Sequence, residues 1–440
     1  MDEIIEKIKK IAVPSTKIKN MKDEIAETAI NLIKKYASQY PQIKNIEFGG
    51  SYAKGTWIPK KADIDIFMKF KNDVDKSEFI KLTRIIGFES LKKFCPYTRY
   101  SEHPYIEAII KQTKINLVPC YDVKLGAWKS AADRSVFHTK FMTKFLSDEM
   151  KDDVRVLKLF LISNEIYGSE ILKQGFSGYV TEVLVYNFKS FINSINELSK
   201  LQQKQIIGKT NKKFNTPISI IDPIDVNRNL AAAISIKNFA KLALTCRAFL
   251  RKPSTNYFIS KSLKKKKNWK NVIIIKFYYS YRSPDILGGQ IMKTVNALTM
   301  QMNEYGFNVL QNSVKVNKKY VCLLLLLETR RINELYIKNG PCVFHKEDCN
   351  KFITKNTKKS DLMWINNEGH VSALQKRQYA DARQFLLNFL KNKLTGVSNG
   401  LKKDIKKWNN VTYFSIKKNR TLENMLNGFA VTDETIFPSN

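Results

Sequence analysis

Apolar residues recur with helical spacing in two segments at the start of the chain, 4–11 and 25–36, with Pro14 between them. This spacing predicts two helices. The segment 43–48 (IKNIEF) is rich in strand-forming residues, and the segment 62–70 (ADIDIFMKF) alternates apolar and polar positions. Both patterns are typical of β-strands. The chain therefore begins with two helices that lead into a sheet.

Further elements are expected before residue 148. Helical spacing around 79–94 predicts another helix, and three more strands are predicted in the segments YTRYSEH, YIEAIIK and KINLVPCY. The last two are expected to form a hairpin with Gln112 and Thr113 at its turn. This mixture of helices and strands predicts a small α/β domain over 1–147.

The periodicity is helical from Asp148 to Phe249, which predicts a helical domain over 148–260. The lysine-rich segment KSLKKKKNWK then predicts a linker. Beyond it, the strands NVIIIKFYY and KYVCLLLLLE alternate with helical stretches near 287–304, 346–355 and 380–396. We therefore expect a third, α+β domain over 261–440. The fold class is a multi-domain α/β and α+β chain.

The longest apolar run lies in the segment YVCLLLLLE. It is far shorter than the about 20 residues that a membrane-spanning helix needs. It predicts a buried strand, and we expect no membrane partner.

The chain carries 75 Lys and Arg against 40 Asp and Glu, a net charge of +35 that is spread along its whole length. Self-repulsion on this scale is expected to be offset by a polyanionic partner. A lysine-rich, AT-biased genome or a salt-adapted surface is the alternative explanation. The charge therefore favours a long polyanion, held across several domains.

The six cysteines are scattered without a CxxC pair, and the N-terminus lacks the apolar segment of a signal peptide. We therefore expect reduced thiols and a cytoplasmic location. Cys342, His345 and Cys349 lie together in CVFHKEDC, but their spacing matches no common zinc site and a fourth ligand is not evident. Chance proximity is the favoured interpretation.

Candidate chemistry lies in the segment 49–67, GGSYAKGTWIPKKADIDIF. Asp63 and Asp65 are two positions apart on the predicted strand, so they share one face at a separation of about 6.6 Å. Two such carboxylates are expected to hold a pair of Mg²⁺ ions about 3.5 to 4 Å apart, as in phosphoryl transfer. The Gly49–Ser51 turn and Lys54 offer N–H groups, a hydroxyl and a positive charge to a triphosphate. The segment predicts nucleotidyl transfer.

The same segment resembles the signature of the DNA polymerase β-like nucleotidyltransferases and, more narrowly, of the archaeal-type, class I CCA-adding enzymes. The resemblance covers nearly the whole chain and continues through RYSEHPYIEAIIK, VPCYDV, KSAADRSVFHTKF, VRVLKLFL, NEIYGSE, GFSGYVTEVL and IDPIDVNRNLAAAIS, and more faintly through NGP and FITKN. It implies a head, neck, body and tail. It also implies addition of C, C and A to tRNA 3′ ends from CTP and ATP, without a nucleic-acid template and with release of pyrophosphate.

The resemblance also implies roles for individual residues. Asp63 and Asp65 match two metal-binding carboxylates, and Arg228 matches an arginine that recognises the incoming base. The residues at positions that match the triphosphate site are Gly50, Ser51, Lys54, Thr139, Lys158 and Tyr167. Taken alone, Lys158 and Arg228 also suit solvated helix faces, and Tyr167 suits a place in a core.

Two positions depart from the family pattern. Asn116 stands where a third carboxylate is expected, and Thr139 stands where a second histidine commonly follows His138. Asn is a neutral ligand and cannot act as a base, so metal affinity and activation of the 3′-hydroxyl are both expected to fall. Threonine keeps a hydrogen-bond donor for a phosphate but has no cationic form.

A replacement for the missing acid is hard to find in the sequence. Asp122 is about 20 Å away along an ordinary strand, which is too far. Glu107 is expected diagonal to Asn116, at roughly 7 to 8 Å, if Gln112 and Thr113 form the turn. Three explanations of Asn116 stay open: an engineered substitution, a natural enzyme that uses other ligands, or a tRNA-binding pseudoenzyme. The presence of every other site element favours the first.

Basic and aromatic residues interleave in the last third of the chain, a pattern that suits contacts to phosphates and unpaired bases. The basic candidates are Lys376, Arg377, Lys402, Lys403, Lys406 and Lys407, with others in the segment YFSIKKNR. A solvated helix face with its aromatic side packed inward is the alternative for each cluster. The expected partner is the acceptor and T-stem region of tRNA, recognised by its shape and backbone. A homodimer is left open.

Two other functions are compatible with the sequence. One is a poly(A) polymerase or oligoadenylate synthase built on the same head. The other is a non-catalytic protein that binds tRNA.

Overall fold

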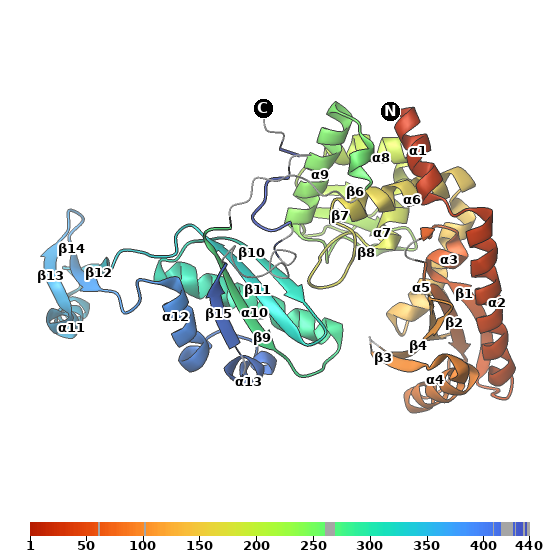
Figure 1. Cartoon of the computed structure of the whole chain (residues 1–440), viewed down its shortest axis with the longest axis horizontal. Helices are drawn as coiled ribbons and strands as arrows, with labels where there is room; N and C mark the ends of the chain where they lie inside the picture. Colours follow the sequence, from red (N-terminus) through yellow and green to blue (C-terminus); the bar gives the residue numbers. More distant parts are fainter. Residues whose placement is uncertain are drawn as a thin grey trace. The chain divides into compact units, whose positions relative to one another are not determined.

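The computed structural model describes residues 1–59, 62–100, 103–259, 269–407, 409–414, 426, 428–433 and 436–437. The chain forms two compact units, Met1–Leu263 with Glu434–Asn440, and Lys264–Asp433 (Figure 1). The helices of the first unit are α1 (Asp2–Ala12), α2 (Thr16–Ala37), α3 (Gly50–Lys54), α4 (Lys76–Ser90), α5 (Ala131–Phe145), α6 (Asp148–Ser163), α7 (Gly178–Phe188), α8 (Phe191–Ser199) and α9 (Ile236–Arg251). Its strands are β1 (Ile43–Gly49), β2 (Ile64–Phe70), β3 (Tyr97–Tyr100), β4 (Pro104–Ile110), β5 (Thr113–Tyr121), β6 (Gln205–Ile207), β7 (Ile218–Asp222) and β8 (Asp225–Asn229).

A five-stranded sheet of order β1-β2-β5-β4-β3 forms the first part of this unit. β2 and β5 are parallel neighbours, and the other pairs are antiparallel. The helices and strands predicted for this region are confirmed. The predicted turn of the β4–β5 hairpin is wrong by one residue: Lys111 and Gln112 occupy it, and Ile110 pairs with Thr113. Both turn residues have positive φ, 44° and 64°, as two-residue hairpin turns require when they follow the twist of the strands.

The side chains of β2 alternate between two layers, because successive residues of a strand point to opposite faces. One layer is a buried core against α2 and α4, to which β2 contributes Ile64, Ile66, Met68 and Phe70. On the other face Phe67 packs with Cys120 of β5 and Val136 of α5. The N-terminal end of β2 on this second face is the place where the predicted chemistry lies.

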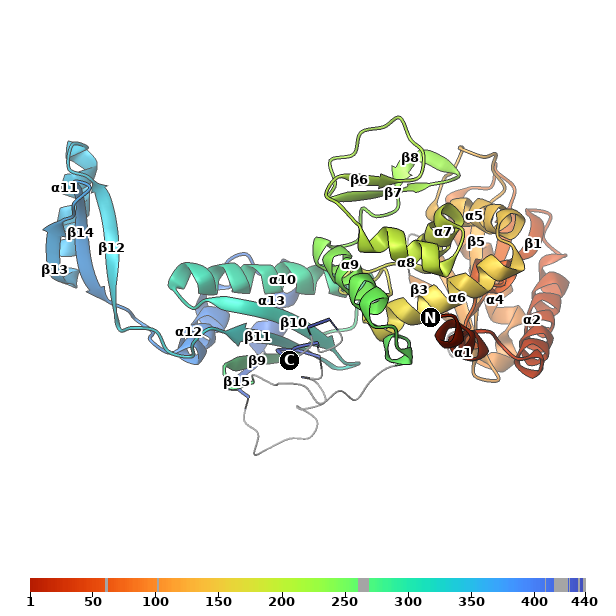
Figure 2. The ribbon, with the colours of Figure 1, turned by 90° about the horizontal axis from the view of Figure 1, so that it is seen from above.

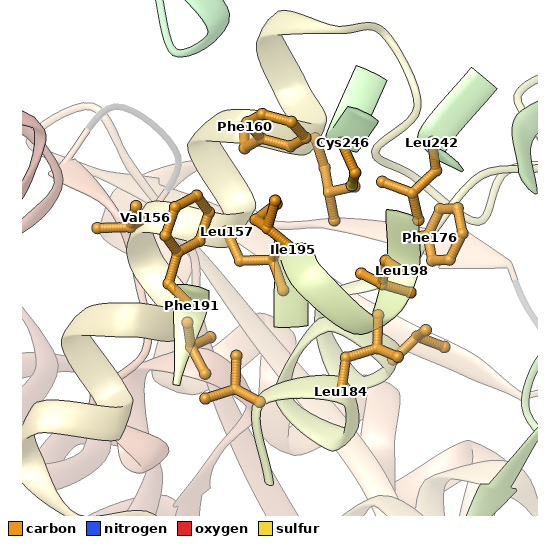
Figure 3. Close-up of a cluster of buried hydrophobic side chains, with 14 of the residues drawn as sticks. Val156, Leu157, Phe160, Phe176, Leu184, Phe191, Ile195, Leu198, Leu242 and Cys246 are labelled. Carbon is orange, nitrogen blue, oxygen red and sulfur yellow. The ribbon is translucent and has the colours of Figure 1, made fainter. Parts of the chain in front are cut away.

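A second core holds α5 to α9 together and includes Ile5 and Ile8 of α1. Figure 3 shows its centre, where Phe160 of α6 and Phe191 of α8 project into the same layer. The ring centroid of Phe160 lies 6.1 Å from that of Phe191 and 5.7 Å from that of Phe249. Aromatic contacts of this kind add to the large apolar area that each ring buries.

The region 148–260 is mainly helical, as predicted, but it also contains a three-stranded sheet of order β6-β7-β8 that the periodicity does not predict (Figure 2). Leu230 and Ile234 contribute to the apparent helical spacing, yet α9 begins only at Ile236. The N–H of Leu230 instead donates to the carbonyl of Ile220 in β7, at 2.8 Å. The helical spacing predicted for this segment is therefore wrong at Leu230, which hydrogen-bonds to the small sheet.

The second unit has strands β9 (Val272–Tyr278), β10 (Val309–Val316), β11 (Tyr320–Leu327), β12 (Leu335–Cys342), β13 (Ser360–Ile365), β14 (His370–Lys376) and β15 (Asn409–Tyr413), and helices α10 (Pro284–Tyr305), α11 (Lys346–Asn356), α12 (Ala382–Asn388) and α13 (Asn399–Lys407). One sheet has the order β10-β11-β9-β15 and the other β12-β14-β13. β11 is buried on both faces: Leu323 and Leu325 belong to one core, and Leu324 and Leu326 belong to another. The unbroken apolar run is explained by this double burial, and the predicted buried strand is confirmed.

Among the described residues, no helix combines the length and the apolar character that crossing a bilayer requires.

The aromatic contacts of Phe160 lead to a prediction about stability. Phe160 is fully buried, so Phe160→Ala should lower the free energy of unfolding by about 3 to 5 kcal/mol through lost burial and the cavity left behind. Urea unfolding followed by circular dichroism measures this change. Phe88→Ala is the control, because Phe88 is 39% exposed, and it should cost less than about 1 kcal/mol. Equal effects of the two substitutions would contradict the assigned core.

Candidate active site

Five residues on five adjacent strands lie in one row across the first sheet. The pairing register joins the row in the order Gly49, Asp65, Asn116, Glu107 and Tyr97. Paired residues on neighbouring strands point to the same face. Asp65 is therefore next to Asn116, as the resemblance implies. Glu107 lies directly opposite Asn116 and not diagonal to it, because the hairpin turn is one residue earlier than predicted.

Asp63 lies one residue before β2, and Ile64, between the two acids, is fully buried in the opposite layer. Asp65 thus lies on the second face, and the alternation predicts that Asp63 shares it. Burial raises the pKa of the Asp63 carboxyl, and Lys114 opposes this rise. The negative charges of Asp65 and Glu107 raise the same pKa further. The acids are close enough to repel one another, and a bound cation would relieve that repulsion.

The turn before α3 lies against the carboxylate of Asp65. Gly50 has a φ of 60°, and a Cβ at this position would lie 1.9 Å from Oδ2 of Asp65. A glycine is required here both by the backbone conformation and by this close approach. Ser51 follows within α3 and is partly exposed. The predicted triphosphate turn and the predicted metal ligand are therefore adjacent.

Asn116 has one satisfied and one unsatisfied polar atom. Its Nδ2 donates to Oδ1 of Asp65 at 2.9 Å, whereas its own Oδ1 is buried and has no hydrogen-bond partner among the described residues. Burial raises the pKa of Asp65, and the hydrogen bond from Asn116 opposes that rise. A buried, unpartnered oxygen beside a buried carboxylate suits a hard divalent cation, which takes oxygen ligands.

The ligand set is nevertheless short of acids. In the part of the chain that the structure describes, no group of three or more His, Cys, Asp and Glu side chains is arranged to hold a metal ion. The oxygen donors at this position are two carboxylates, from Asp63 and Asp65, and one amide, from Asn116. This set fits a divalent cation with less charge than three acids would provide.

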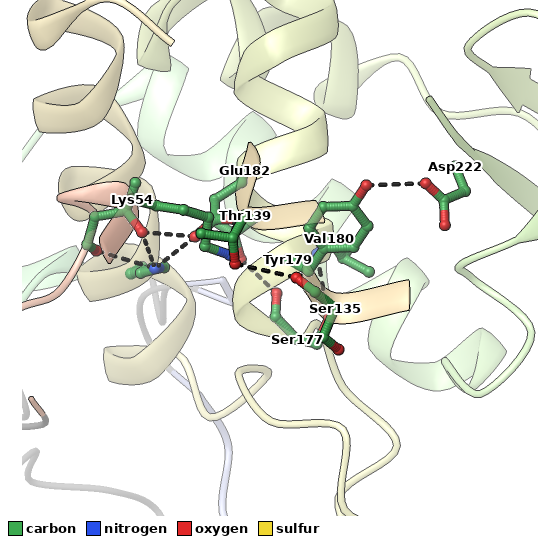
Figure 4. Close-up of polar contacts among 11 residues, drawn as sticks. Lys54, Ser135, Thr139, Ser177, Tyr179, Val180, Glu182 and Asp222 are labelled. Atoms are coloured by element: carbon green, nitrogen blue, oxygen red, sulfur yellow. Dashed lines mark hydrogen bonds and ion pairs between the residues drawn. The ribbon is translucent and has the colours of Figure 1, made fainter. Parts of the chain in front are cut away.

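Lys54 and Lys158 both reach one buried carboxylate, Glu182 of α7. Figure 4 shows Lys54 and Glu182. Lys54 Nζ lies 2.5 Å from Oε2, Lys158 Nζ lies 3.4 Å from Oε1, and Thr56 Oγ1 donates to Oε1 at 2.6 Å. Burial alone would raise the pKa of Glu182, but the two lysines outweigh it and lower that pKa. Burial lowers the pKa of Lys158 to about 8, against the attraction of Glu182. Sequence reasoning found both lysines and missed the acid that positions them.

The Tyr167 hydroxyl and the Lys158 ammonium both lie close to Gly178, the first residue of α7. A Cβ added to Gly178 would meet the Tyr167 hydroxyl at 3.0 Å and Lys158 Nζ at 3.7 Å. Thr139 behaves differently, because its hydroxyl donates to the carbonyl of Ser135 at 3.0 Å within α5 (Figure 4). The structure thus brings Tyr167 to Lys158, while the Thr139 hydroxyl hydrogen is already engaged.

Asp222, at the end of β7, is the centre of a second polar cluster. Its carboxylate lies 3.0 Å from His138 Nε2, accepts from the Tyr179 hydroxyl at 2.9 Å and pairs with Arg228 Nη1 at 2.9 Å. The rings of His138 and Tyr179 are stacked, with centroids 3.8 Å apart. Burial alone would raise the pKa of Asp222, but His138 and Arg228 lower it. Arg228 lies on strand β8 and pairs with Asp222. The sequence alone does not single out Asp222 as its partner.

The basic residues predicted to contact RNA are placed unequally. Arg377 is anchored within its unit: Nη1 donates to the carbonyl of Tyr305 at 2.6 Å, and the guanidinium lies 4.8 Å from the ring centroid of Tyr336. Lys376, at the end of β14, is exposed. Arg377 is therefore engaged in packing, whereas Lys376 is accessible.

The other predicted RNA contacts lie on α13. This helix buries Leu401 and Ile405 on its inner side. Its basic residues at other positions are Lys402, Lys403, Lys406 and Lys407. Trp408 and the part of YFSIKKNR from residue 415 onward lie outside the described residues.

Comparison with known families divides the chain into three consecutive matches. Residues 30–141 match a nucleotidyltransferase domain, residues 152–259 match the second domain of tRNA nucleotidyltransferase, and residues 270–413 match the C-terminal domain of CCA-adding enzymes. A CCA-adding enzyme of Saccharolobus islandicus is 33% identical over 343 residues, which cover 77% of this chain and 82% of the relative. One of Sulfolobus acidocaldarius is 29% identical over 398 residues, covering 88% of this chain and 90% of that enzyme.

The buried cluster around Glu182 leads to a second prediction. Glu182→Gln removes the counter-charge of two buried lysines, so the free energy of unfolding should fall by about 3 to 5 kcal/mol at pH 7. Urea unfolding measures the loss. Glu197→Gln is the matched control, because Glu197 and Lys200 form an ion pair of 3.1 Å at the surface, which should contribute less than about 1 kcal/mol. A Glu182→Gln protein as stable as the control would show that the lysines do not depend on this acid.

Proposed function

The chain belongs to the archaeal-type CCA-adding enzymes, and on that premise we propose that it adds C, C and A to tRNA 3′ ends from CTP and ATP, without a nucleic-acid template. The 3′-hydroxyl of the tRNA attacks the α-phosphate of the nucleotide, and pyrophosphate leaves. The observation that carries the proposal is the Asp65 carboxylate, which lies directly beside the Gly50 turn and is paired with Asn116 of the next strand. This is the geometry in which acids and a triphosphate share divalent ions.

We propose Mg²⁺ as the cation. Asp63, Asp65 and the unpartnered amide oxygen of Asn116 are the groups that would hold it. When bound, the cation supplies Lewis acidity, which favours loss of the hydroxyl proton and stabilises charge on the leaving pyrophosphate. Asn116 cannot accept that proton, so in this chain the proton has to pass to Asp63, Asp65 or water.

The remaining site residues bind and orient the nucleotide. Lys54 and Lys158 bring two positive charges against the single charge of Glu182, so the surplus is available to a triphosphate. The turn at Gly50 and Ser51, with Tyr167, is proposed to contact the same phosphates. The base is proposed to meet the edge of the Arg228 guanidinium, whose position is held by Asp222. Thr139 is proposed to contact a phosphate only after its bond to Ser135 opens.

The tRNA is proposed to lie along the basic C-terminal part of the chain, with its acceptor and T-stem region recognised through shape and backbone. We propose a head over 1–147, a neck over 148–260 and a body with tail over 261–440. The matched ranges 30–141, 152–259 and 270–413 support this division. The six free cysteines support the proposed cytoplasmic location.

Incorporation of labelled nucleotides tests the proposed function. With tRNA that lacks its CCA end, the chain is expected to incorporate CTP first and then ATP, and to stop after one A. Asn116→Asp should raise the rate by about 10-fold or more, because it adds a charged ligand that is also a base. Strict use of ATP with long tails would indicate a poly(A) polymerase. Salt-sensitive binding without incorporation, in the Asn116→Asp variant as well, would indicate a pseudoenzyme.

The salt dependence of tRNA binding tests the proposed contact of α13. Lys403→Gln with Lys406→Gln removes two exposed charges, so the slope of log Kd against log salt concentration should become shallower by roughly 1.5 to 2. Filter binding at several salt concentrations measures the slope. The matched control is Lys7→Gln with Lys10→Gln, two exposed lysines of α1, which should leave the slope unchanged. Equal slopes for both double variants would remove α13 from the interface.

A further inference from the structure

Lys22 is a buried cation that the proposed mechanism does not use. It lies on the inner face of α2, one turn before Ile25 and Ala26, which belong to the core that α2 forms with the first sheet. The residue is only 7% exposed. An apolar side chain would fill this position without the cost of burying a charge. We therefore expect the ammonium group to serve a specific contact.

The Lys22 ammonium bridges two strands beyond the point where their backbone pairing begins. Nζ donates to the carbonyl of Ala62 at 3.0 Å and to the Thr113 hydroxyl oxygen at 2.6 Å. The parallel ladder of β2 and β5 starts with the pair Ile64 and Ile115. Two positions before this pair, counted along each strand, are Ala62 and Thr113. The lysine side chain thus extends the link between the strands past the first pair of the ladder.

Asp63 lies between these two fixed points. Its neighbour Ala62 is held by Lys22, and its neighbour Ile64 is held by the strand pairing and by complete burial. A residue whose backbone is fixed on both sides has its Cα–Cβ direction fixed as well. The charge of Asp63 also opposes the fall that burial causes in the pKa of Lys22, so the ammonium and the carboxylate are close enough to interact.

The segment that joins α3 to β2 is held in the same way at its other end. Arg155 Nε donates to the carbonyl of Trp57 at 3.1 Å, and Lys158 Nζ donates to the carbonyl of Thr56 at 2.9 Å. Both of these cations are buried. Buried cations thus hold the backbone just after α3 and again just before Asp63.

We propose that Lys22 is a positioning residue of the metal site: it holds the backbone before Asp63 so that this carboxylate shares a divalent cation with Asp65. Lys22 acts through Ala62 and not through contact with the substrate. This inference rests on the proposed function, because it concerns a ligand of the proposed cation. The alternative role is purely structural, in which the bridge to Ala62 and Thr113 only stabilises the fold.

Binding of Mn²⁺ alone to the full chain separates the two roles. Electron paramagnetic resonance measures free Mn²⁺ in a titration without nucleotide or tRNA. Lys22→Met keeps a long apolar side chain in the core but removes the charge and the N–H donors. It should weaken Mn²⁺ binding by roughly 10-fold or more, because groups that orient metal ligands have effects of this size.

Phe79→Leu is the matched control. Phe79 is fully buried in α4, and its ring centroid lies 4.7 Å from that of Phe70 and 4.5 Å from that of Tyr121, the last residues of β2 and β5. The substitution therefore disturbs the same core at the opposite end of the same two strands. Both variants should lower the urea midpoint of unfolding, but Phe79→Leu should leave Mn²⁺ affinity within about 2-fold of the parent protein.

Two results would overturn the proposal: an unchanged Mn²⁺ affinity in the Lys22→Met protein, or an equal loss of affinity in both variants. If Lys22→Met does not fold, Thr113→Val removes one of the two acceptors and leaves the lysine in place. That variant should weaken Mn²⁺ binding by about 3-fold or more, and an unchanged affinity would again count against the proposal. A parent protein that binds no Mn²⁺ would contradict the metal site and this inference together.

The assignment of Lys22 can fail independently of the proposed function. If the nucleotide assay gives CCA addition and the Lys22→Met protein binds Mn²⁺ as the parent does, only the role of Lys22 is wrong. If Mn²⁺ binding depends on Lys22 but no nucleotide is incorporated into tRNA, the proposed function is wrong and the positioning role stands.

Discussion

The parallel pairing of β2 with β5 is the interaction on which the site depends. It sets Asp65 beside Asn116, and a slip of one residue would turn Asp65 into the core formed with α2 and α4. The register is fixed by the apolar residues of the opposite face. Ile64 and Ile66 of β2 pack there with Ile115 and Leu117 of β5, and all four are fully buried. The positions of the acids are therefore determined by hydrophobic burial on the far side of the sheet.

A second constraint joins the residues around α3 to the helices that follow the sheet. Glu182 of α7 binds Lys54 and Thr56, while Arg155 of α6 donates from Nε to the carbonyl of Trp57 at 3.1 Å. Buried ion pairs contribute little net stability, since desolvation offsets their attraction, but a broken one is costly. Their effect here is geometric: they hold Lys54 and Lys158 together around Glu182 and Thr56, just after α3.

The sequence predicts the parts of this site that follow from local patterns. The alternation around Asp63 and Asp65 places both acids on one face, and the glycine pair before Ser51 predicts the turn. Glu182 and Asp222 could not be found in this way, because a single acid in an apolar segment carries no local signal of its distant partners. The position of Glu107 shows that strand register is also hard to predict from sequence. A one-residue error in the hairpin turn moves it from a diagonal position to one directly opposite Asn116, and only the strand register decides between the two.

The row across the sheet also explains how the site can exist without a cation. An aspartate at position 116 would stand beside the buried Asp65, and the two charges would repel unless a cation lay between them. Asn116 replaces that repulsion by a hydrogen bond of 2.9 Å. The nearest other acid of the row, Glu107, lies one strand further away on β4, where Tyr97 and Arg99 compensate its charge. An amide at position 116 thus lowers the electrostatic cost of the sheet in the absence of a cation. The expected consequence is a site that binds metal less tightly than three adjacent acids would, but that folds without it.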